Sequence, residues 1–226
     1  MTITSRFDLY SFWRTSATYR VRVALNLKGV EVNEKNVNLD TGENLSLAFL
    51  KINPLGAIPA LVDHDADASP LPITQSSAIL EYLEEAFPAI ATLPRDLPGR
   101  ARVRSLAAML TADTHPLVTG RIKKYLVANA SFDDVAWRAW QINWFTVGLQ
   151  AFEARLATEK ETGIYCHGDT PTIADICLAS ILVVMRVFKI EVAAIPHINR
   201  IMAECEKHPA FAKADPARQA GAPTAA

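Results

Sequence analysis

The first part of the chain alternates between patterns of apolar and polar positions that are typical of strands and of helices. Residues 30–39 alternate between apolar and polar, as a half-buried strand does, and residues 76–87 place apolar side chains on one helix face. Gly29 is the kind of residue that ends a helix. The expected order is strand 7–11, helix 17–28, strand 30–39, helix 45–50, strands 58–63 and 71–74, and helix 76–87. This βαβαββα order predicts a small mixed sheet with helices on its faces.

The second part of the chain shows no strand pattern. A proline-punctuated run follows the last α/β helix and predicts a linker. Beyond it, helical periodicity covers residues 100–126, 133–157, 172–190 and 197–208. The last residues contain few large apolar side chains and should not pack. We therefore expect an α/β domain over 1–88, a linker over 89–98, an all-helical domain over 99–213 and a disordered tail over 214–226.

Composition excludes several classes of protein. The 226 residues carry a formal net charge of −1, which gives no reason to expect nucleic acid or an anionic membrane as a partner. No apolar run is long enough to span a bilayer, and the N-terminus does not resemble a signal peptide. The three cysteines show no CxxC spacing, so we expect a cytoplasmic protein without disulfides or a metal site.

Several hydroxyl side chains lie between the first expected strand and the first expected helix. Thr15 and Ser16 precede a helix start, and a hydroxyl beside a positive helix end can lower the pKa of a thiol. No cysteine stands there, so the thiol would belong to a ligand. The alternative is plain helix capping, with Arg14 and Arg20 as solvated surface charges.

Two further turns carry candidate ligand contacts. Gln75 and Ser76 stand where a strand enters a helix, which favours a carboxylate site, although capping alone explains Ser76 more often. Pro59 opens a strand after Ile58, and this local pattern favours a trans bond, since only about 5–6% of such bonds in folded proteins are cis. The three turns together suit a small peptide with a thiol and carboxylates, a description that fits glutathione.

Four motifs in order resemble those of the zeta class of glutathione transferases, the group that contains maleylacetoacetate and maleylpyruvate isomerases. They stand here as RTSATYRVRVALNLKG, INPLGAIPALVD, QSSAILEYLEEAFP and GIYCHGDTPTIADICL. The resemblance covers nearly the whole chain up to the tail. It implies a thioredoxin-like first domain, an all-helical second domain, a homodimer, and glutathione as cofactor.

The resemblance also implies roles for individual residues. Thr15 would stabilise the glutathione thiolate, with Ser16 beside it, and Pro59 would be cis. The remaining glutathione contacts would come from the Ile58 backbone at the cysteinyl unit, Gln75 and Ser76 at the γ-glutamyl end, Asn44 near the glycyl carboxylate, and His115 from the helical domain. Basic residues would bind the acidic substrate, and the candidates are Arg14, Arg121 and Arg186.

Three departures from the family pattern concern the substrate. Ala17 replaces the signature cysteine, and Val187 stands where the family has an arginine, with Arg186 one residue earlier. The asparagine that follows HP or QP in the family is absent from the run HPLVTGR. These changes leave the glutathione contacts intact and affect the half of the site that would hold the acid.

The predicted function is glutathione-dependent cis–trans isomerisation of a small unsaturated diacid such as maleylacetoacetate or maleylpyruvate. The alternatives are a transferase or dehalogenase that acts on α-halo acids or other electrophiles, and a non-catalytic binding protein of the same fold. For the homodimer, the sequence offers an apolar stripe of Leu106, Met109 and Leu110, which would mark an interface if the domain left it uncovered.

Overall fold

The computed structural model describes residues 5–65 and 70–223, which fall into two compact units. The first unit comprises two stretches of the chain, the residues up to Ala91 and those from His208 onward. The second unit spans Thr92–Lys207. The expected boundaries differ from this division, because the last short helix of the chain packs with the α/β elements and not with the helical ones.

The first unit contains a four-stranded mixed sheet in the order β2-β1-β3-β4. Strand β2 pairs parallel to β1, whereas β3 is antiparallel to both β1 and β4. Tyr10 pairs with Ala60, and Ala60 pairs with Thr74. The end of β1, the start of β3 and the end of β4 therefore lie at one edge, called here the Tyr10 edge. The strands are β1 (Phe7–Ser11), β2 (Asn33–Asn36), β3 (Ala60–Asp63) and β4 (Leu71–Thr74).

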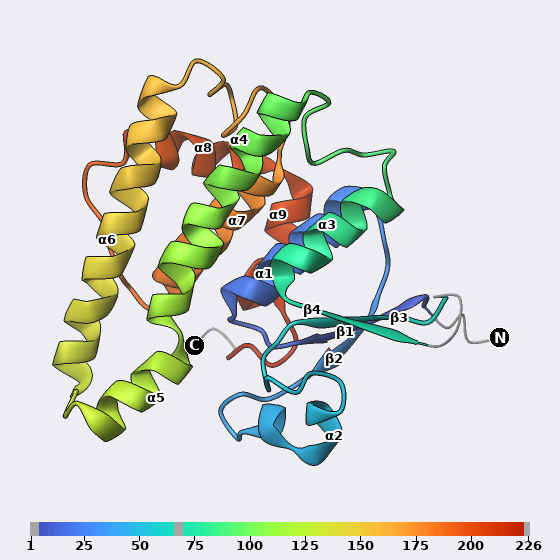
Figure 1. The fold of residues 1–226 in the computed structure, drawn as a ribbon, viewed down its shortest axis with the longest axis vertical. Helices are drawn as coiled ribbons and strands as arrows, with labels where there is room; N and C mark the ends of the chain where they lie inside the picture. The colour runs from blue at the N-terminus through green and yellow to red at the C-terminus, as the bar shows by residue number, and fades with distance from the viewer. Residues whose placement is uncertain (1–4, 66–69, 224–226) are drawn as a thin grey trace. The chain divides into compact units, whose positions relative to one another are not determined.

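Helix α1 is buried along most of its length. Helices α1 (Ser16–Lys28) and α3 (Ser76–Ala86) lie side by side over one face of the sheet (Figure 1). Helix α9 (Pro209–Lys213) packs against α1, where the Asn26 amide donates to the Ala210 carbonyl at 2.9 Å. Ten of the 13 residues of α1 are buried. A 3₁₀ turn η1 (Glu43–Leu45) and helix α2 (Leu47–Leu50) connect β2 to β3.

Two expectations for the first unit need correction. The strand expected over 30–39 is short and mostly exposed, since β2 comprises only Asn33–Asn36. Residues 214–223 are not disordered: they form a 3₁₀ turn η4 (Pro216–Arg218), with Ala214 and Pro216 buried. Small side chains and backbone hydrogen bonds suffice there without large apolar residues, and residues 224–226 lie outside the described part.

The second unit is built from helices around α7. The described helices are α4 (Leu97–Ala108), α5 (Gly120–Asn129), α6 (Asp134–Thr158), α7 (Ile173–Val187) and α8 (Pro196–Lys207). Helix α7 is buried along most of its length and packs against both α4 and α8. None of the helices in the described ranges has the length and apolar character that crossing a bilayer requires.

The helical pattern over 100–126 is interrupted in the structure. Helix α4 passes into a π turn η2 (Met109–Thr114), where the Thr114 hydroxyl donates to the Met109 carbonyl at 2.8 Å. A 3₁₀ turn η3 (His115–Val118) follows before α5 begins. Pro116 has no N–H to donate, which explains why the regular helix does not continue.

The stripe of Leu106, Met109 and Leu110 does not mark an interface. Leu106 and Leu110 are each 0% exposed, because this face of α4 and η2 packs inside the second unit. Met109 is half-buried. The sequence argument for a dimer from this stripe is therefore wrong.

A polar network closes the edge of the sheet opposite the Tyr10 edge. Arg6 donates to Asp63 from Nε at 2.9 Å and from Nη2 at 2.6 Å, and the Tyr82 hydroxyl donates to the same carboxylate. The Asp63 side chain is 0% exposed. These hydrogen bonds, chiefly that from Arg6, lower the pKa of Asp63 to about 2.

The depressed pKa predicts how stability depends on pH. Asp63 binds a proton more readily in the unfolded chain, so its contribution is present above about pH 4 and is lost as the pH falls towards 2. Asp63→Asn should lower the free energy of unfolding at pH 7 by about 2 kcal/mol and flatten its decline between pH 4 and 2. Urea denaturation at several pH values measures both effects.

Asp65→Asn is the matched control, because Asp65 lies 3.8 Å from Arg6 with its side chain 68% exposed. That variant should keep the native pH dependence, since exposed ion pairs contribute little. An equally steep acid decline in Asp63→Asn and the native protein would contradict the assignment.

Candidate active site

Three turns of the first unit meet at the Tyr10 edge. One follows β1 and leads into α1, one precedes β3, and one joins β4 to α3. The strand register places all three side by side, because Tyr10, Ala60 and Thr74 are paired across the sheet. The structure thus brings together the three turns that the sequence singled out.

Thr15 and Ser16 occupy different positions at the start of α1. Thr15 is the N-cap: its hydroxyl accepts from the Thr18 amide at 3.4 Å and lies 2.7 Å from the Thr18 hydroxyl. Ser16 is the first helical residue and is 2% exposed. Within the described ranges, its buried hydroxyl has no hydrogen-bond partner. A buried hydroxyl without a partner is unfavourable, so its presence suits a ligand atom.

The turn before β3 presents backbone groups. The Ile58–Pro59 bond is cis, which confirms the expectation from the family resemblance and overturns the trans bond favoured by the local pattern. Asn53, which is 4% exposed, fixes this turn by donating to the Ala57 carbonyl at 2.5 Å. The described residues provide no hydrogen-bond partner for the backbone of Ile58, which leaves it for an extended peptide.

Asn44 stands beside the same turn. Its amide donates to the Gly56 carbonyl at 2.7 Å, which ties η1 to the segment before Pro59. Gly56 has φ of +62°, and a Cβ there would lie 2.9 Å from Leu45 Cδ2. Glycine is therefore required for this close approach, and the contact fixes Asn44 next to the candidate site.

The turn between β4 and α3 holds a strained backbone. Gln75 has φ of 69° and ψ of 116°, a conformation that non-glycine residues rarely adopt, and its side chain makes no capping hydrogen bond. Ser76 begins α3 and is 6% exposed. The first backbone N–H groups of a helix have no partner within the helix, and they attract anions. This turn therefore suits a carboxylate.

Arg20 contacts this turn from α1. Its Nη1 donates to the Ser76 hydroxyl at 3.1 Å, and Arg20 is only 2% exposed. The alternative interpretation of Arg20 as a solvated surface charge is therefore wrong. A signal was available in the sequence, because Arg20 follows Ser16 by four residues and so shares its helix face.

Arg14 lies next to Thr15 but its charge is paired. It makes a two-pronged ion pair with Asp40, in which Nη1 donates to Oδ2 at 2.8 Å. This hydrogen bond lowers the pKa of Asp40. The guanidinium also lies over the rings of Phe12 and Trp13. A substrate carboxylate would have to compete with Asp40 for Arg14.

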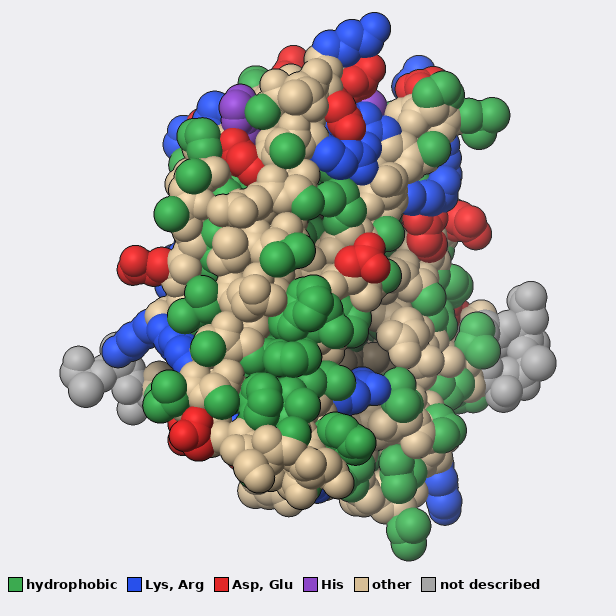
Figure 2. All heavy atoms as spheres, turned by 60° about the vertical axis from the view of Figure 1, so that its left-hand side comes forward, with side chains coloured by type: hydrophobic (Ala, Val, Ile, Leu, Met, Phe, Trp, Pro, Cys, Tyr) green, Lys and Arg blue, Asp and Glu red, His purple; other side chains and the backbone are tan. Residues whose placement is uncertain are grey.

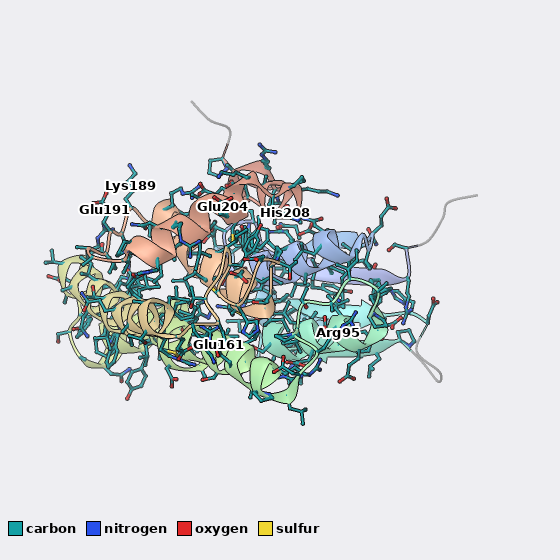
Figure 3. The ribbon with its side chains drawn as sticks, turned by 90° about the horizontal axis from the view of Figure 1, so that it is seen from above. Arg95, Glu161, Lys189, Glu191, Glu204 and His208 are labelled. Carbon is teal, nitrogen blue, oxygen red and sulfur yellow. The ribbon has the colours of Figure 1, made fainter. Side chains whose placement is uncertain are left out.

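The other three predicted site residues belong to the second unit. His115 lies in η3, Arg121 in α5 and Arg186 near the end of α7. Arg186 pairs with Glu206 of α8, and Arg121 is exposed, with no ion pair among the residues that are described. Beyond α7, Lys189 has φ of 53° and lies with Glu191 in the segment leading to α8 (Figure 3).

The protein's own cysteines are poor nucleophiles. Cys166, Cys177 and Cys205 are free and buried. Burial raises the pKa of Cys166 and of Cys205 above the ordinary thiol value. In the described ranges, no group of three or more His, Cys, Asp or Glu side chains is arranged so that it could bind a metal ion. A reactive thiol at the Tyr10 edge would have to be brought by a ligand.

Comparison with known proteins identifies the family. Residues 5–85 match the glutathione S-transferase N-terminal domain, and residues 146–209 match the C-terminal domain. A maleylpyruvate isomerase of a Ralstonia species is 41% identical over 93% of this chain and 97% of its own length. The chain therefore belongs to the glutathione S-transferase family.

Solved structures narrow this assignment to the zeta class. The holo structure of a maleylpyruvate isomerase, described as a bacterial glutathione S-transferase of zeta class, is 41% identical with a TM-score of 0.89, over 96% of this chain and 100% of its own. The maleylacetoacetate isomerase of Methylobacterium extorquens, solved with malonate and glutathione, is 43% identical with a TM-score of 0.90 over the same shares. The thioredoxin-like first domain and the all-helical second domain expected from the sequence are confirmed.

Proposed function

We propose that this protein is a glutathione-dependent cis–trans isomerase of a small unsaturated diacid. The observation that carries the proposal is the buried hydroxyl of Ser16, which has no partner among the described residues and lies at the same sheet edge as the cis-Pro59 turn and the start of α3. The relatives named maleylpyruvate and maleylacetoacetate isomerase support the reaction. The malonate and glutathione bound in one relative support an acidic substrate.

The residues at the Tyr10 edge fit the parts of glutathione. The Ile58 backbone would pair with the cysteinyl unit, and Gln75 and Ser76 would hold the γ-glutamyl end. Asn44 would lie near the glycyl carboxylate. His115, on the second unit, would add a polar contact. Each of these groups is a hydrogen-bond donor or a backbone amide, as an anionic peptide requires.

The chemistry divides between the cofactor and the chain. When bound, glutathione would supply a thiolate nucleophile for reversible addition to the cis double bond, and it would be returned unchanged. Thr15 would donate a hydrogen bond to the sulfur, with Ser16 beside it, and the start of α1 favours the anionic form. Arg14, Arg121 and Arg186 are the cations that would hold the substrate carboxylates and the developing enolate.

A transferase or dehalogenase acting on α-halo acids is the second candidate. Two observations favour keeping it: Arg14 is paired with Asp40, and Val187 stands in the place of the family arginine. Both concern the binding of a diacid and neither affects the glutathione contacts. A non-catalytic binding protein is the third candidate, and the orphan Ser16 hydroxyl and the strained Gln75 argue against it.

A parallel assay separates the three candidates. With maleylacetone, dichloroacetate and chlorodinitrobenzene offered side by side, we expect isomerisation of maleylacetone at constant glutathione concentration and none without glutathione. Halide release or a glutathione conjugate without any isomer would contradict the isomerase proposal and favour a transferase. Glutathione binding without turnover of any of the three compounds would favour a binding protein.

The two hydroxyls of α1 are separated by paired variants. Thr15→Val should lower turnover by about one to three orders of magnitude, as the loss of an oxyanion-type donor does. It should also lower stability by about 1 kcal/mol, because Thr15 is the N-cap. Glutathione affinity should fall only modestly, since Gln75, Ser76 and the Ile58 backbone remain. Rates, binding and urea denaturation are measured on one preparation.

Thr15→Ser is the control, because it keeps both the cap and the hydroxyl and should keep most of the activity. Ser16→Ala should leave stability unchanged or slightly raised, since it removes a buried hydroxyl without a partner. A larger loss of turnover in Ser16→Ala than in Thr15→Val would move the thiolate contact to Ser16. Near-native rates in both variants would show that neither hydroxyl serves the sulfur.

We also propose that the protein forms a homodimer and acts in the cytoplasm, where its free buried cysteines stay reduced. The argument for a dimer is that α6 carries exposed apolar side chains. Among them are Val135, which is 77% exposed, and Ile142, which is 40% exposed and lies two helical turns further on. Figure 2, turned towards the α5 and α6 side of the second unit, shows apolar side chains gathered on this face.

Light scattering at micromolar concentration should give twice the mass of the chain. Ile142→Asp should shift the protein towards the monomer, because a charge would be buried in the interface. Ile164→Asp is the matched control, since Ile164 is 47% exposed but lies between α6 and α7. A monomer in the native protein would contradict the dimer, and an unshifted Ile142→Asp would place the interface elsewhere.

A further inference from the structure

The most deeply buried cation of the first helix lies against the candidate carboxylate site. Arg20 is 2% exposed and ranks among the largest fully buried side chains of the described residues. It reaches from α1 to the first residue of α3, where Nη1 lies 3.1 Å from the Ser76 hydroxyl. Burying a guanidinium is favourable only where hydrogen bonds satisfy it, and the hydrogen bond to Ser76 is one that this placement provides.

The placement follows from helix geometry. Side chains on a helix lean towards its N-terminus, so Arg20 extends back towards the Tyr10 edge. Ser16 stands one turn earlier on the same face of α1. Ser16, Arg20 and Ser76 are thus three buried polar side chains, and Arg20 connects the helix face that carries Ser16 to the candidate carboxylate position.

The direction of the hydrogen bond determines what Ser76 can do. A guanidinium has only donors, so the Ser76 oxygen must accept from Arg20. The Ser76 proton is then directed away from Arg20, and within the described part of the chain no group accepts it. A hydroxyl that accepts a charge-assisted hydrogen bond is also a stronger donor in turn. Ser76 is therefore prepared to donate to an anion at the start of α3.

We propose that Arg20 is a positioning residue for the γ-glutamyl carboxylate of glutathione. It fixes the Ser76 hydroxyl as a donor towards that carboxylate and so acts on the carboxylate through Ser76. This inference rests on the proposed function, since it assumes that glutathione occupies the Tyr10 edge with its γ-glutamyl end at α3. It assigns to Arg20 no contact with the thiol or the substrate.

A ligand comparison tests the role directly. The probes are glutathione and 4-aminobutyryl-cysteinylglycine, which lacks only the γ-glutamyl α-carboxylate, and binding of each is measured by calorimetry. The native protein should bind glutathione about tenfold or more tighter, since hydrogen bonds to a charged group are strong. In Arg20→Met this preference should shrink to about twofold or less, while the affinity for the analogue stays nearly constant. An unchanged preference would overturn the proposal.

Variants of the partner and of a neighbour separate positioning from structure. In a Ser76→Ala background, Arg20→Met should change the preference little further, because Arg20 acts through Ser76. Arg22→Met is the matched control: Arg22 is a buried cation of the same helix that pairs with Glu34, so its loss should leave the preference intact. A loss of preference in Arg22→Met equal to that in Arg20→Met would show a general effect of helix destabilisation and overturn the proposal.

Arg20→Lys covers the case in which Arg20→Met does not fold. The lysine keeps the charge but cannot reproduce the guanidinium geometry, so the preference should fall by about threefold or more. If Arg20→Lys keeps the native preference for glutathione over the analogue, the guanidinium is not what positions Ser76, and the proposal is overturned. Failure of the proposed function has a different signature. If glutathione does not occupy the Tyr10 edge, the native protein should bind neither glutathione nor the analogue, and if the reaction alone is not an isomerisation, the parallel substrate assay shows it while the binding preference persists.

Discussion

The pairing of Tyr10 with Ala60, and of Ala60 with Thr74, fixes where every candidate ligand contact of the first unit lies. Because β3 runs antiparallel to both neighbours, the chain leaves β1, enters β3 and leaves β4 at the same edge. A shift by one residue in either pairing would turn the strand side chains to the opposite face. The helix starts, the Pro59 turn and the buried Arg20 form one site only because this register holds.

The sequence predicted the fold well where hydrophobic periodicity is strong. The βαβαββα order and the long helices α6 and α7 agree with the structure to within a few residues. It failed where structure depends on distant parts of the chain or on small side chains. Residues 214–223 contain few large apolar side chains, and they are ordered through backbone hydrogen bonds and the buried Ala214 and Pro216. The strand at β2 is short because its residues are polar and mostly exposed.

The residues of the candidate site also fall into those that the sequence indicated and those that it did not. The sequence singled out Thr15, Pro59, Gln75 and Ser76, because turns between strands and helices have local signatures, and the strand register brings their turns to one edge of the sheet. Arg20 was missed because a charged residue inside a helix is exposed in most proteins. Its burial becomes visible only when α3 and α9 are placed against α1, and no local pattern encodes those contacts. The pairing of Arg14 with Asp40 was missed for the same reason, since 26 residues separate the two in sequence.

The position of α9 has a consequence for how the chain acquires its structure during synthesis. Helix α1 leaves the ribosome early, but the segment that covers its remaining face is nearly two hundred residues away in the chain, at Pro209–Lys213. Until that segment has been made, the nascent α/β unit displays apolar and polar groups of α1 that the finished protein hides, including the Asn26 amide that later meets Ala210. The α/β unit therefore completes its packing after translation of the helical unit, although it is encoded first.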